Sequence, residues 1–280
     1  HAHPDDEASK TAGVVARYSA EGARAVLVTC TGGEAGDVLN AAVEVPDDEA
    51  ALAALRFEEL RDAARTLGYG AVHLLGYRDS GMLGTEHNDH PESFARADLD
   101  EATGRLVEIM RRERPHVVIA YADEQSFYPH PDHVRAHEVA VAAFDACGDA
   151  ERFVDAGPAW QPAKLYYTAW SRALVESWLE ASDADAASPF RRFLDSGAAF
   201  ADERFTTRID VRDQLEQRRQ ALLAHRSQVD PESFWMRIRV DVMREIFPYE
   251  DYILERSHVE VELEGDWEVD LFSGLRRVPD

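Results

Sequence analysis

Two short motifs carry side chains of the types that bind and use a metal ion. The first is His3-Pro4-Asp5-Asp6-Glu7, and the second is Tyr128-Pro129-His130-Pro131-Asp132-His133. Imidazole nitrogens and carboxylate oxygens are the usual ligands of catalytic zinc, and two histidines with one carboxylate leave a position for water. Zinc lowers the pKa of that water to about 7, which supplies hydroxide at neutral pH. The motifs together predict a metal-assisted hydrolase.

The spacing within the motifs suggests which side chains bind the ion. His3 and Asp6 are three residues apart, so a turn entering a helix can aim both at one point, and His133 would approach from a neighbouring strand end. Asp5 is then available as a general base. Either motif alone also fits a turn with an Asp helix cap. A structural His130–Asp132 pair and a Tyr128 without a chemical task are the alternatives for those residues.

Apolar runs and helical periodicity alternate through the first half of the chain, which predicts a parallel sheet flanked by helices. The expected strands are 24–29, 71–75 and 116–121, and the expected helices are 5–18, 47–67, 98–112 and 133–147. We interpret His1-Ala2-His3 as the end of a first strand that begins before residue 1. Ligands of open α/β sheets collect at the carboxyl ends of the strands, where both motifs are expected.

In the second half of the chain, strands and helices no longer alternate regularly. We expect strands at 164–169, 206–211 and 252–255, helices at 212–228 and 232–246, and two acidic helical stretches with a break near 187–189. The fold class predicted is α/β, with a Rossmann-like, mostly parallel sheet and a smaller C-terminal α+β portion. We divide the chain into a metal-binding catalytic domain, 1–160, and a C-terminal portion, 161–280, that closes the substrate cleft.

Composition excludes several classes of protein. The net charge of -24 disfavours binding to nucleic acid or to anionic membranes, and no apolar run approaches the ~20 residues of a membrane helix. The two cysteines, Cys30 and Cys147, are too few for a disulfide framework, so we expect the protein to work in a reducing cytoplasm. We expect both thiols to be buried. No G-x-G-x-x-G follows an expected strand, so nucleotide binding has little support. Oligomeric state is not predicted.

The two motifs resemble those of the LmbE/PIG-L family of zinc deacetylases, which act on N-acyl glucosamine derivatives. Further stretches are similar along nearly the whole chain: Glu7-Ala8-Ser9-Lys10, Thr31-Gly32-Gly33-Glu34, Tyr77-Arg78-Asp79-Ser80-Gly81 and Leu222-Leu223-Ala224-His225-Arg226-Ser227-Gln228. The resemblance implies a soluble enzyme that hydrolyses a linear amide bond of a small-molecule amino-sugar or thiol-conjugate substrate.

The resemblance also implies roles for individual residues. His3, Asp6 and His133 match the zinc ligands, although iron(II) also suits such a site. Asp5 matches the general base. His130 matches the residue that protonates the leaving amine, and Asp132 matches the carboxylate that orients His130. Tyr128 matches a tyrosine that polarises the amide carbonyl. Arg56 and Asp79 match residues that bind the sugar and inositol. Without the resemblance, Arg56 fits a solvated helix face and Asp79 a turn.

Lys10 favours one branch of the family. A lysine here is typical of the branch that cleaves the amide of mycothiol S-conjugates to an N-acetylcysteine S-conjugate and glucosaminyl-inositol, a detoxification reaction. The chain has only one other lysine, Lys164. A surface lysine is the alternative for Lys10. His225 and Gln228 either line the pocket or pack helices.

Several other functions stay open. The first is an N-acetylglucosaminyl-inositol deacetylase of mycothiol biosynthesis, and the second is a deacetylase of another N-acyl glucosamine compound such as a glycosylated natural product. A sugar-binding module without catalysis is disfavoured by the complete set of motif residues. His87 and His90, in the loop 84–95, are expected to be exposed rather than to bind a ligand.

Overall fold

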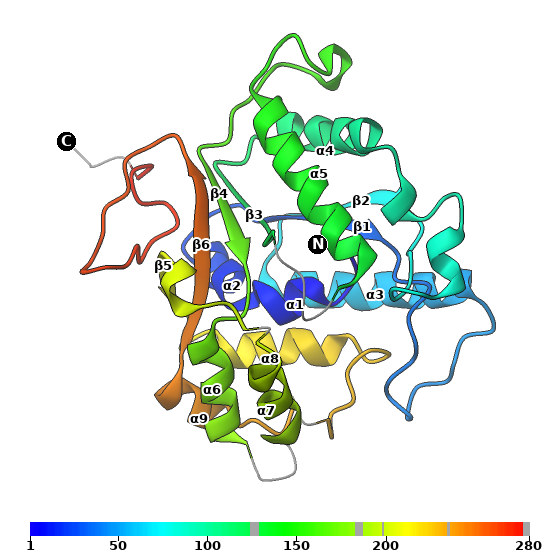
Figure 1. Ribbon diagram of the computed structural model, residues 1–280, viewed down its shortest axis with the longest axis vertical. Coiled ribbons are helices and arrows are strands. Elements are labelled where there is room, and N and C mark those ends of the chain that lie inside the picture. The colour runs from blue at the N-terminus through cyan, green and yellow to red at the C-terminus, as the bar shows by residue number, and fades with distance from the viewer. Residues whose placement is uncertain (124–128, 183–186, 198, 234–235, 277–280) are drawn as a thin grey trace.

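The computed structural model describes residues 1–123, 129–182, 187–197, 199–233 and 236–276 of the chain. Its strands are β1 (Val26–Thr31), β2 (Ala71–Tyr77), β3 (Val117–Tyr121), β4 (Lys164–Thr168), β5 (Thr207–Asp210) and β6 (Tyr249–Ser257). Its α-helices are α1 (Asp6–Lys10), α2 (Ala12–Ala20), α3 (Glu49–Leu67), α4 (Leu99–Glu113), α5 (Pro131–Cys147), α6 (Arg172–Ala181), α7 (Ala187–Asp195), α8 (Leu215–Ala224) and α9 (Val240–Ile246). Figure 1 shows their arrangement.

The strands form two hydrogen-bonded groups. β1 and β2 pair in parallel, and a four-stranded sheet has the order β3-β4-β6-β5. β3 and β4 are parallel, while β6 runs antiparallel to both of its neighbours. The predicted α/β fold class is confirmed. Strands from beyond residue 160 continue the sheet that β3 begins, so the two halves of the chain share one sheet.

The first residues connect the two groups of strands. His1 donates its terminal amine to Val28 O at 2.8 Å, and Thr31 N–H donates to Ala2 O at 3.0 Å, so the chain starts alongside β1. On the other side, Ala2 N–H donates to the phenol oxygen of Tyr121 at the end of β3, at 2.9 Å. The first motif therefore enters the molecule between β1 and β3, at their carboxyl ends (Figure 1).

Local sequence signals explain the helices of the first half. Asp48 accepts a hydrogen bond from Ala51 N–H at the start of α3, which ends at Gly68 with a φ of 85°. Asp98 caps α4 through Glu101 N–H, and Pro131 occupies the first turn of α5. Capping side chains, proline at a helix start and glycine at a helix end are the expected signals for such boundaries.

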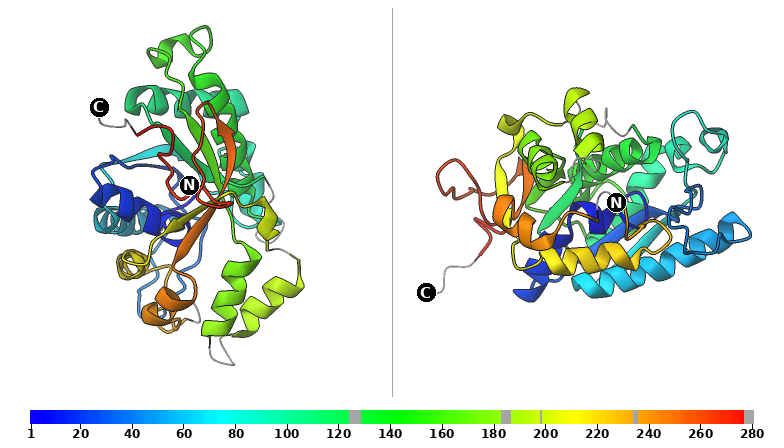
Figure 2. Two further views of the ribbon diagram at one scale, coloured as in Figure 1. Left: turned by 90° about the vertical axis from the view of Figure 1, so that its left-hand side faces the viewer. Right: turned by 90° about the horizontal axis from the view of Figure 1, so that it is seen from below.

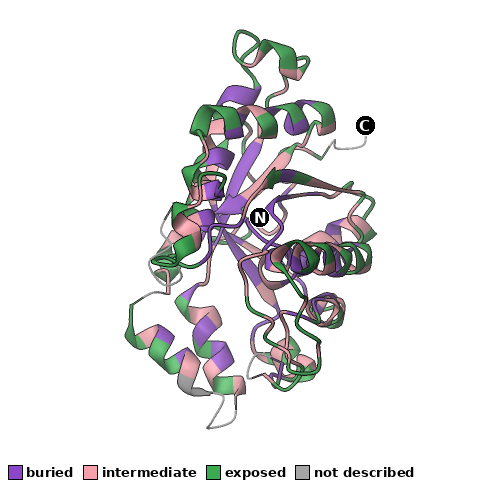
Figure 3. Cartoon of the chain, turned by 90° about the vertical axis from the view of Figure 1, so that its right-hand side faces the viewer, coloured by how far each residue is buried: buried purple, intermediate pink, exposed green. Residues whose placement is uncertain are grey.

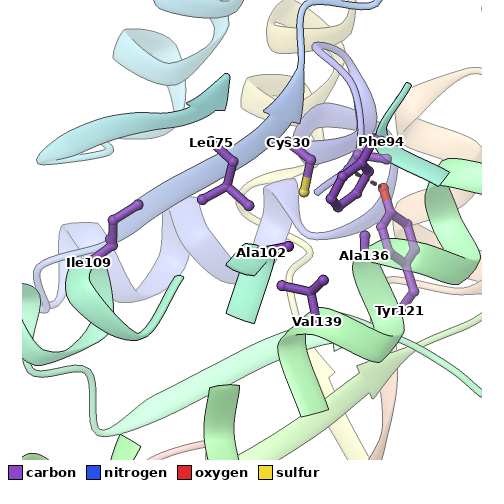
Figure 4. Close-up of a cluster of buried hydrophobic side chains, with 9 residues drawn as sticks. Cys30, Leu75, Phe94, Ala102, Ile109, Tyr121, Ala136 and Val139 are labelled. Carbon is purple, nitrogen blue, oxygen red and sulfur yellow. Dashed lines mark hydrogen bonds between the residues drawn. The ribbon is translucent and has the colours of Figure 1, made fainter. Parts of the chain in front are cut away.

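The core of the first half lies between β1, β2 and β3 on one side and α4 and α5 on the other. Its members are Ala2, Cys30, Leu75, Phe94, Ala102, Ile109, Tyr121, Ala136 and Val139 (Figure 4). Cys30 and Cys147 are buried free thiols, as expected for small apolar side chains. Figure 3 shows that buried residues concentrate on the strands and on the inward helix faces.

Helices of the second half cover the first motif. α8 packs against α1, α2 and α3, and the view from below in Figure 2 shows α8 alongside α3. α6, α7 and α9 form a separate group with an aromatic core that includes Trp178, Phe190 and Phe193. None of the helices in the described part of the chain combines the length and apolar character that a bilayer crossing requires.

Three sequence expectations for helices were wrong in detail. The expected helix 5–18 is broken at Thr11, because Gly13 N–H and Val14 N–H donate to the Glu250 carboxylate rather than to the preceding turn. The helix expected at 232–246 begins only at Val240. By contrast, the expected division into two acidic helices is present near the predicted place, because α6 ends at Ala181 and α7 begins at Ala187, with Pro189 tolerated in the first turn of α7.

The helix expected at 212–228 is also shorter than predicted. α8 begins at Leu215, after Asp210 has accepted a hydrogen bond from Arg212 N–H. It ends at Ala224, because His225 leaves the helical conformation.

Candidate metal centre

His3, Asp6 and His133 meet at one buried point. Their exposed fractions are 8%, 3% and 3%. Asp6 Oδ2 lies 3.5 Å from His3 Nδ1 and 3.5 Å from His133 Nε2, and all three ligand atoms lie within 4.8 Å of one another. Ligand atoms at the corners of a zinc tetrahedron are about 3.3 Å apart when each bond is about 2.05 Å. The donor set and its spacing fit a tetrahedral metal ion.

The outer nitrogen of His3 faces two buried carboxylates. His3 Nε2 lies 3.2 Å from Asp132 Oδ2 and 3.5 Å from Asp79 Oδ1. A histidine that binds metal through one nitrogen usually donates the other N–H to a carboxylate, which fixes the tautomer and the ring direction. His3, Asp79, His130 and Asp132 also satisfy the distance criterion for a metal site. The two groups share His3 through its opposite nitrogens, so one ion bound to Nδ1 leaves the second group as its hydrogen-bonding support.

Asp6 is held by residues on both sides. Lys10 Nζ donates to Asp6 Oδ1 at 2.5 Å, and Tyr121 OH donates to Oδ2 at 2.6 Å. Burial alone would raise the pKa of Asp6, but Lys10 and His133 outweigh it and hold the pKa well below its usual range. The carboxylate is thus ionised, as a metal ligand has to be.

Asp5 occupies a strained backbone conformation beside this point. Its φ is 113°, a region that residues other than glycine rarely adopt and that costs on the order of 1–3 kcal/mol. The Asp5 side chain is 28% exposed, whereas that of Asp6 is 5% exposed. Asp5 Oδ2 accepts a hydrogen bond from Arg56 Nη2 at 3.0 Å. Partial burial raises the pKa of Asp5, and Arg56 acts in the opposite direction.

Arg56 is buried, so the alternative of a solvated helix face is wrong. It is 3% exposed and donates to Gly33 O at 2.7 Å and to Pro4 O at 2.6 Å, in addition to Asp5. Gly33 permits this approach, because a Cβ built on it would lie 2.4 Å from Arg56 Cζ. Arg56 therefore fixes the Pro4–Asp5 turn against the loop that follows β1.

The second motif places His130 at the start of α5. His130 is 5% exposed, and its Nδ1 accepts a hydrogen bond from Asp132 N–H at 3.2 Å. Its ring centroid lies 4.4 Å from that of His3. Burial and the neighbouring His3 lower the pKa of His130 to about 4. Tyr128, the other residue expected from this motif, lies outside the described residues.

The Asp132 carboxylate contacts Ser80 as well as His3. Ser80 N–H donates to Asp132 Oδ2 at 2.9 Å, and the Ser80 hydroxyl donates to Oδ1. Asp132 was expected to orient His130, and the structure links these two residues through the Asp132 backbone N–H.

Asp79 is 2% exposed and accepts hydrogen bonds from Gly81 N–H at 2.8 Å and from Ala35 N–H at 3.3 Å. The bond from Ala35 links Asp79 to the loop after β1, so Asp79 does more than close its own turn.

The remaining sequence candidates lie near or outside the centre. The Lys10 side chain is 18% exposed beside Asp6, which disagrees with a freely solvated surface lysine. His87 and His90 are half-buried, and neither belongs to the two metal-binding groups found in the described chain. A separate hollow of about 690 Å³ lies beside Leu254 of β6 and includes Thr206 and Trp267, but it shares no residue with either group.

Sequence reasoning missed Tyr121, Ser80 and Glu7 as residues of the centre. Tyr121 is the last residue of an expected strand at the ligand-bearing edge, and Ser80 and Glu7 stand next to selected residues. Position in the sequence could have marked all three, but their partners are 52 to 218 residues away.

Comparison with known proteins identifies the family. The family model described as PIG-L, GlcNAc-PI de-N-acetylase, matches residues 1–144. The chain belongs to this family. Mycothiol S-conjugate amidase from Streptomyces coelicolor is 39% identical over 285 residues, which cover 99% of this chain and 96% of that protein. The 1D-myo-inositol 2-acetamido-2-deoxy-alpha-D-glucopyranoside deacetylase from Geodermatophilus obscurus is 40% identical and covers 98% and 96%.

A solved structure of another protein agrees with the fold. N,N'-diacetylchitobiose deacetylase from Pyrococcus horikoshii superposes with a TM-score of 0.63 at 20% identity, covering 90% of this chain and 80% of that one. The expected resemblance to the PIG-L family is confirmed. The chain is an amide hydrolase of the deacetylase and amidase type, with a buried His/Asp group able to bind a metal.

Proposed function

We propose that this enzyme is a zinc-dependent amidase that cleaves the amide of mycothiol S-conjugates. The products are an N-acetylcysteine S-conjugate and glucosaminyl-inositol, which makes the reaction a detoxification step. The observation that carries the proposal is the buried group of His3, Asp6 and His133, with spacings near those of a zinc tetrahedron. The 39% identity to an amidase over nearly the whole chain supports this branch.

We propose His3 Nδ1, Asp6 Oδ2 and His133 Nε2 as the metal ligands. Zinc bound there supplies Lewis acidity, which acidifies water and polarises the scissile carbonyl. Iron(II) accepts the same donor set and is the alternative ion. The Asp132 carboxylate supports the ligand role of His3, because it lies 3.2 Å from the opposite ring nitrogen.

Asp5 is the general base in this proposal. It is the more exposed of the two adjacent aspartates, so its carboxylate is accessible to the attacking water while Asp6 faces the ligand histidines. Arg56 keeps the Asp5 carboxylate in place through its hydrogen bond to Oδ2. Asp5 takes a proton from water as the water attacks the carbonyl carbon.

His130 is the general acid. Its Nδ1 accepts the Asp132 N–H, so the ring proton of the neutral imidazole is assigned to Nε2. As His130 gives that proton to the nitrogen of the leaving glucosamine, the proton that Asp5 took from water replaces it, so the imidazole is neutral again when the products form. Asp132 orients both His130, through its backbone, and His3, through its carboxylate. We retain Tyr128 as the proposed donor to the carbonyl oxygen on the ground of the family resemblance.

Lys10 is the proposed contact for the substrate. It is partly exposed beside Asp6, where a conjugate bound at the metal would pass. Arg56 and Asp79 are buried and hydrogen-bonded to the chain itself, which supports a role in shaping the sugar site more than a direct grip.

The second candidate is deacetylation of N-acetylglucosaminyl-inositol, favoured by the 40% identity to the deacetylase from G. obscurus. The test compares kcat/KM for this sugar and for a bimane-labelled mycothiol conjugate, with metal content measured in parallel. We expect the conjugate to be preferred and one zinc per chain to be bound. Preference for the acetylated sugar would replace the amidase proposal by the deacetylase.

Two variants test the proposed roles of Asp5 and Lys10. Asp5→Asn should lower kcat for both substrates by about 10²- to 10⁴-fold, leaving a measurable residual rate, while the metal is retained, because only the base is lost. Lys10→Ala should lower kcat/KM for the conjugate more than for the acetylated sugar. An Asp5→Asn enzyme with unchanged hydrolysis would contradict the proposed mechanism.

A further inference from the structure

The strained backbone of Asp5 is held by a glutamate from the next helix. Asp5 N–H donates to Glu7 Oε2 at 3.0 Å, so the peptide group before Asp5 is fixed from one side. On the other side, Arg56 Nη2 donates to Pro4 O at 2.6 Å. A conformation with a φ of 113° persists only when its surroundings determine it. Glu7 and Arg56 are those surroundings.

Glu7 is in turn bound by a histidine from the far end of the chain. His225 Nε2–H donates to Glu7 Oε1 at 2.6 Å, across 218 residues, and both side chains are 0% exposed. A carboxylate with no access to water needs polar partners for its oxygens. Glu7 has one on each oxygen, namely Asp5 N–H and His225. The link therefore runs directly from the end of α8 to the backbone of Asp5.

The segment that follows α8 also forms hydrogen bonds to α3. Ser227 N–H and Ser227 Oγ donate to the two carboxylate oxygens of Glu59, at 2.9 Å and 2.7 Å. Glu59 is 1% exposed and lies three residues after Arg56 on α3, on a neighbouring part of the helix surface. The segment 225–227 thus contacts both α3, through Glu59, and Glu7, but only the Glu7 contact leads directly to the backbone of Asp5.

We infer that Glu7 and His225 are positioning residues for Asp5, which fix the direction of its carboxylate toward the reacting water. The inference deepens the proposed function and rests on it, because Asp5 is the base only there. Neither residue reaches the substrate in this arrangement, since both are fully buried. A displacement of a catalytic group by about 1 Å costs up to about 100-fold in rate. The effect should therefore appear in kcat rather than in KM.

Glu7→Met and Glu59→Met form a matched pair for the test. Both remove a buried carboxylate that accepts hydrogen bonds from the segment 225–227, but only Glu7 contacts Asp5. With whichever of the two substrates the wild type prefers, we expect Glu7→Met to lower kcat about ten-fold, with KM and metal content unchanged. Glu59→Met should stay within about two-fold of the wild-type kcat although it lowers the melting temperature.

His225 supplies a second pair that does not depend on the Glu7 variant being folded. His225→Gln keeps an N–H donor for Glu7, whereas His225→Ala removes it. We expect His225→Gln to recover most of the kcat that His225→Ala loses, at equal metal content. Circular dichroism checks that each variant is folded.

A double-mutant cycle separates the possible results. If Glu7 acts through Asp5, the loss caused by Glu7→Met should vanish in the Asp5→Asn background. Equal losses of kcat in Glu7→Met and Glu59→Met, or additive losses in the cycle, would overturn the positioning inference while the base assignment stands. Unchanged hydrolysis in Asp5→Asn alone would instead overturn the base assignment, and the inference with it.

Discussion

The phenol ring of Tyr121 lies flat against the imidazole of His133, with 4.5 Å between the ring centroids and 13° between the planes. The same phenol donates to Asp6 Oδ2 at 2.6 Å and accepts from Ala2 N–H. Two of the three proposed ligands, one from each motif, therefore rest on the last residue of β3. This contact connects the motifs before any metal binds.

Tyr121→Phe should weaken metal binding while it leaves the fold intact. The ring that stacks on His133 remains, but Asp6 loses a hydrogen bond, and loss of such support typically lowers metal affinity by 10- to 100-fold. We expect a fall in zinc affinity of about ten-fold, measured by competition with a chromogenic chelator. Tyr77→Phe is the control, because its phenol contacts Glu101 away from the centre. Equal affinities in the two variants would contradict this role of Tyr121.

Glu250→Ala should destabilise the protein through a helix that is distant in sequence. The Glu250 carboxylate accepts Gly13 N–H and Val14 N–H at 2.9 Å each, and so caps α2 where Thr11 makes no side-chain cap. Losing a charged cap and leaving two N–H groups without partners should cost about 2–4 kcal/mol in the free energy of unfolding. Urea denaturation measures the change.

Glu255→Ala, on the same strand but partly exposed, is the control for this effect. It should lie within about 0.5 kcal/mol of wild type. A Glu250→Ala protein that unfolds at the wild-type urea concentration would show that the cap is dispensable.

Lys164→Met should be more damaging than removal of both members of its ion pair. Lys164 Nζ donates to Glu268 Oε1 at 2.6 Å, with exposed fractions of 0% and 1%. Breaking a buried pair leaves one uncompensated charge, which costs about 3–5 kcal/mol, whereas replacing both charges is often nearly neutral. We expect the Lys164→Met/Glu268→Gln double variant to regain a large part of the lost stability. Tyr166 and Thr207, which also donate to Glu268, still bind the glutamine oxygen. A double variant less stable than Lys164→Met would refute this expectation.

Asp270→Asn should reduce stability in a pH-dependent way. Burial favours a higher pKa for Asp270, but Arg276, Phe272 N–H and Tyr18 OH together hold the pKa below its usual value. A carboxylate with a lowered pKa in the folded state stabilises above its unfolded pKa of about 3.9 and loses that effect as the pH falls through the folded value. The variant should be about 1 kcal/mol less stable at pH 7, allowing for the partial exposure of the side chain, and this difference should shrink below pH 4. Melting temperatures from pH 3 to 7 test this, and a constant difference would argue against it.

The sequence was sufficient for the fold class and for the meeting of His3, Asp6 and His133, but not for Tyr121, Ser80 and Glu7. Each motif was expected to follow a strand and precede a helix, so the rule for carboxyl ends of strands placed His3 and His133 together, although residues 1–3 pair with β1 by hydrogen bonds without forming a strand. Local rules could not supply Glu7–His225 or Glu250–Gly13, because these contacts join residues 218 and 237 positions apart. For the same reason the break of the first helix at Thr11 was missed, since a distant carboxylate overrides the local helical preference there.

The cap that Glu250 provides for α2 also has a consequence for synthesis on the ribosome. Gly13 and Val14 leave the exit tunnel long before residue 250 exists, with separations of 237 and 236 residues. At roughly 5–20 residues per second, that interval lasts on the order of 10–50 s. Throughout it, the leading amide groups of α2, the helix that follows the first motif, lack the Glu250 cap, although His3, Asp6 and His133 have already been synthesised.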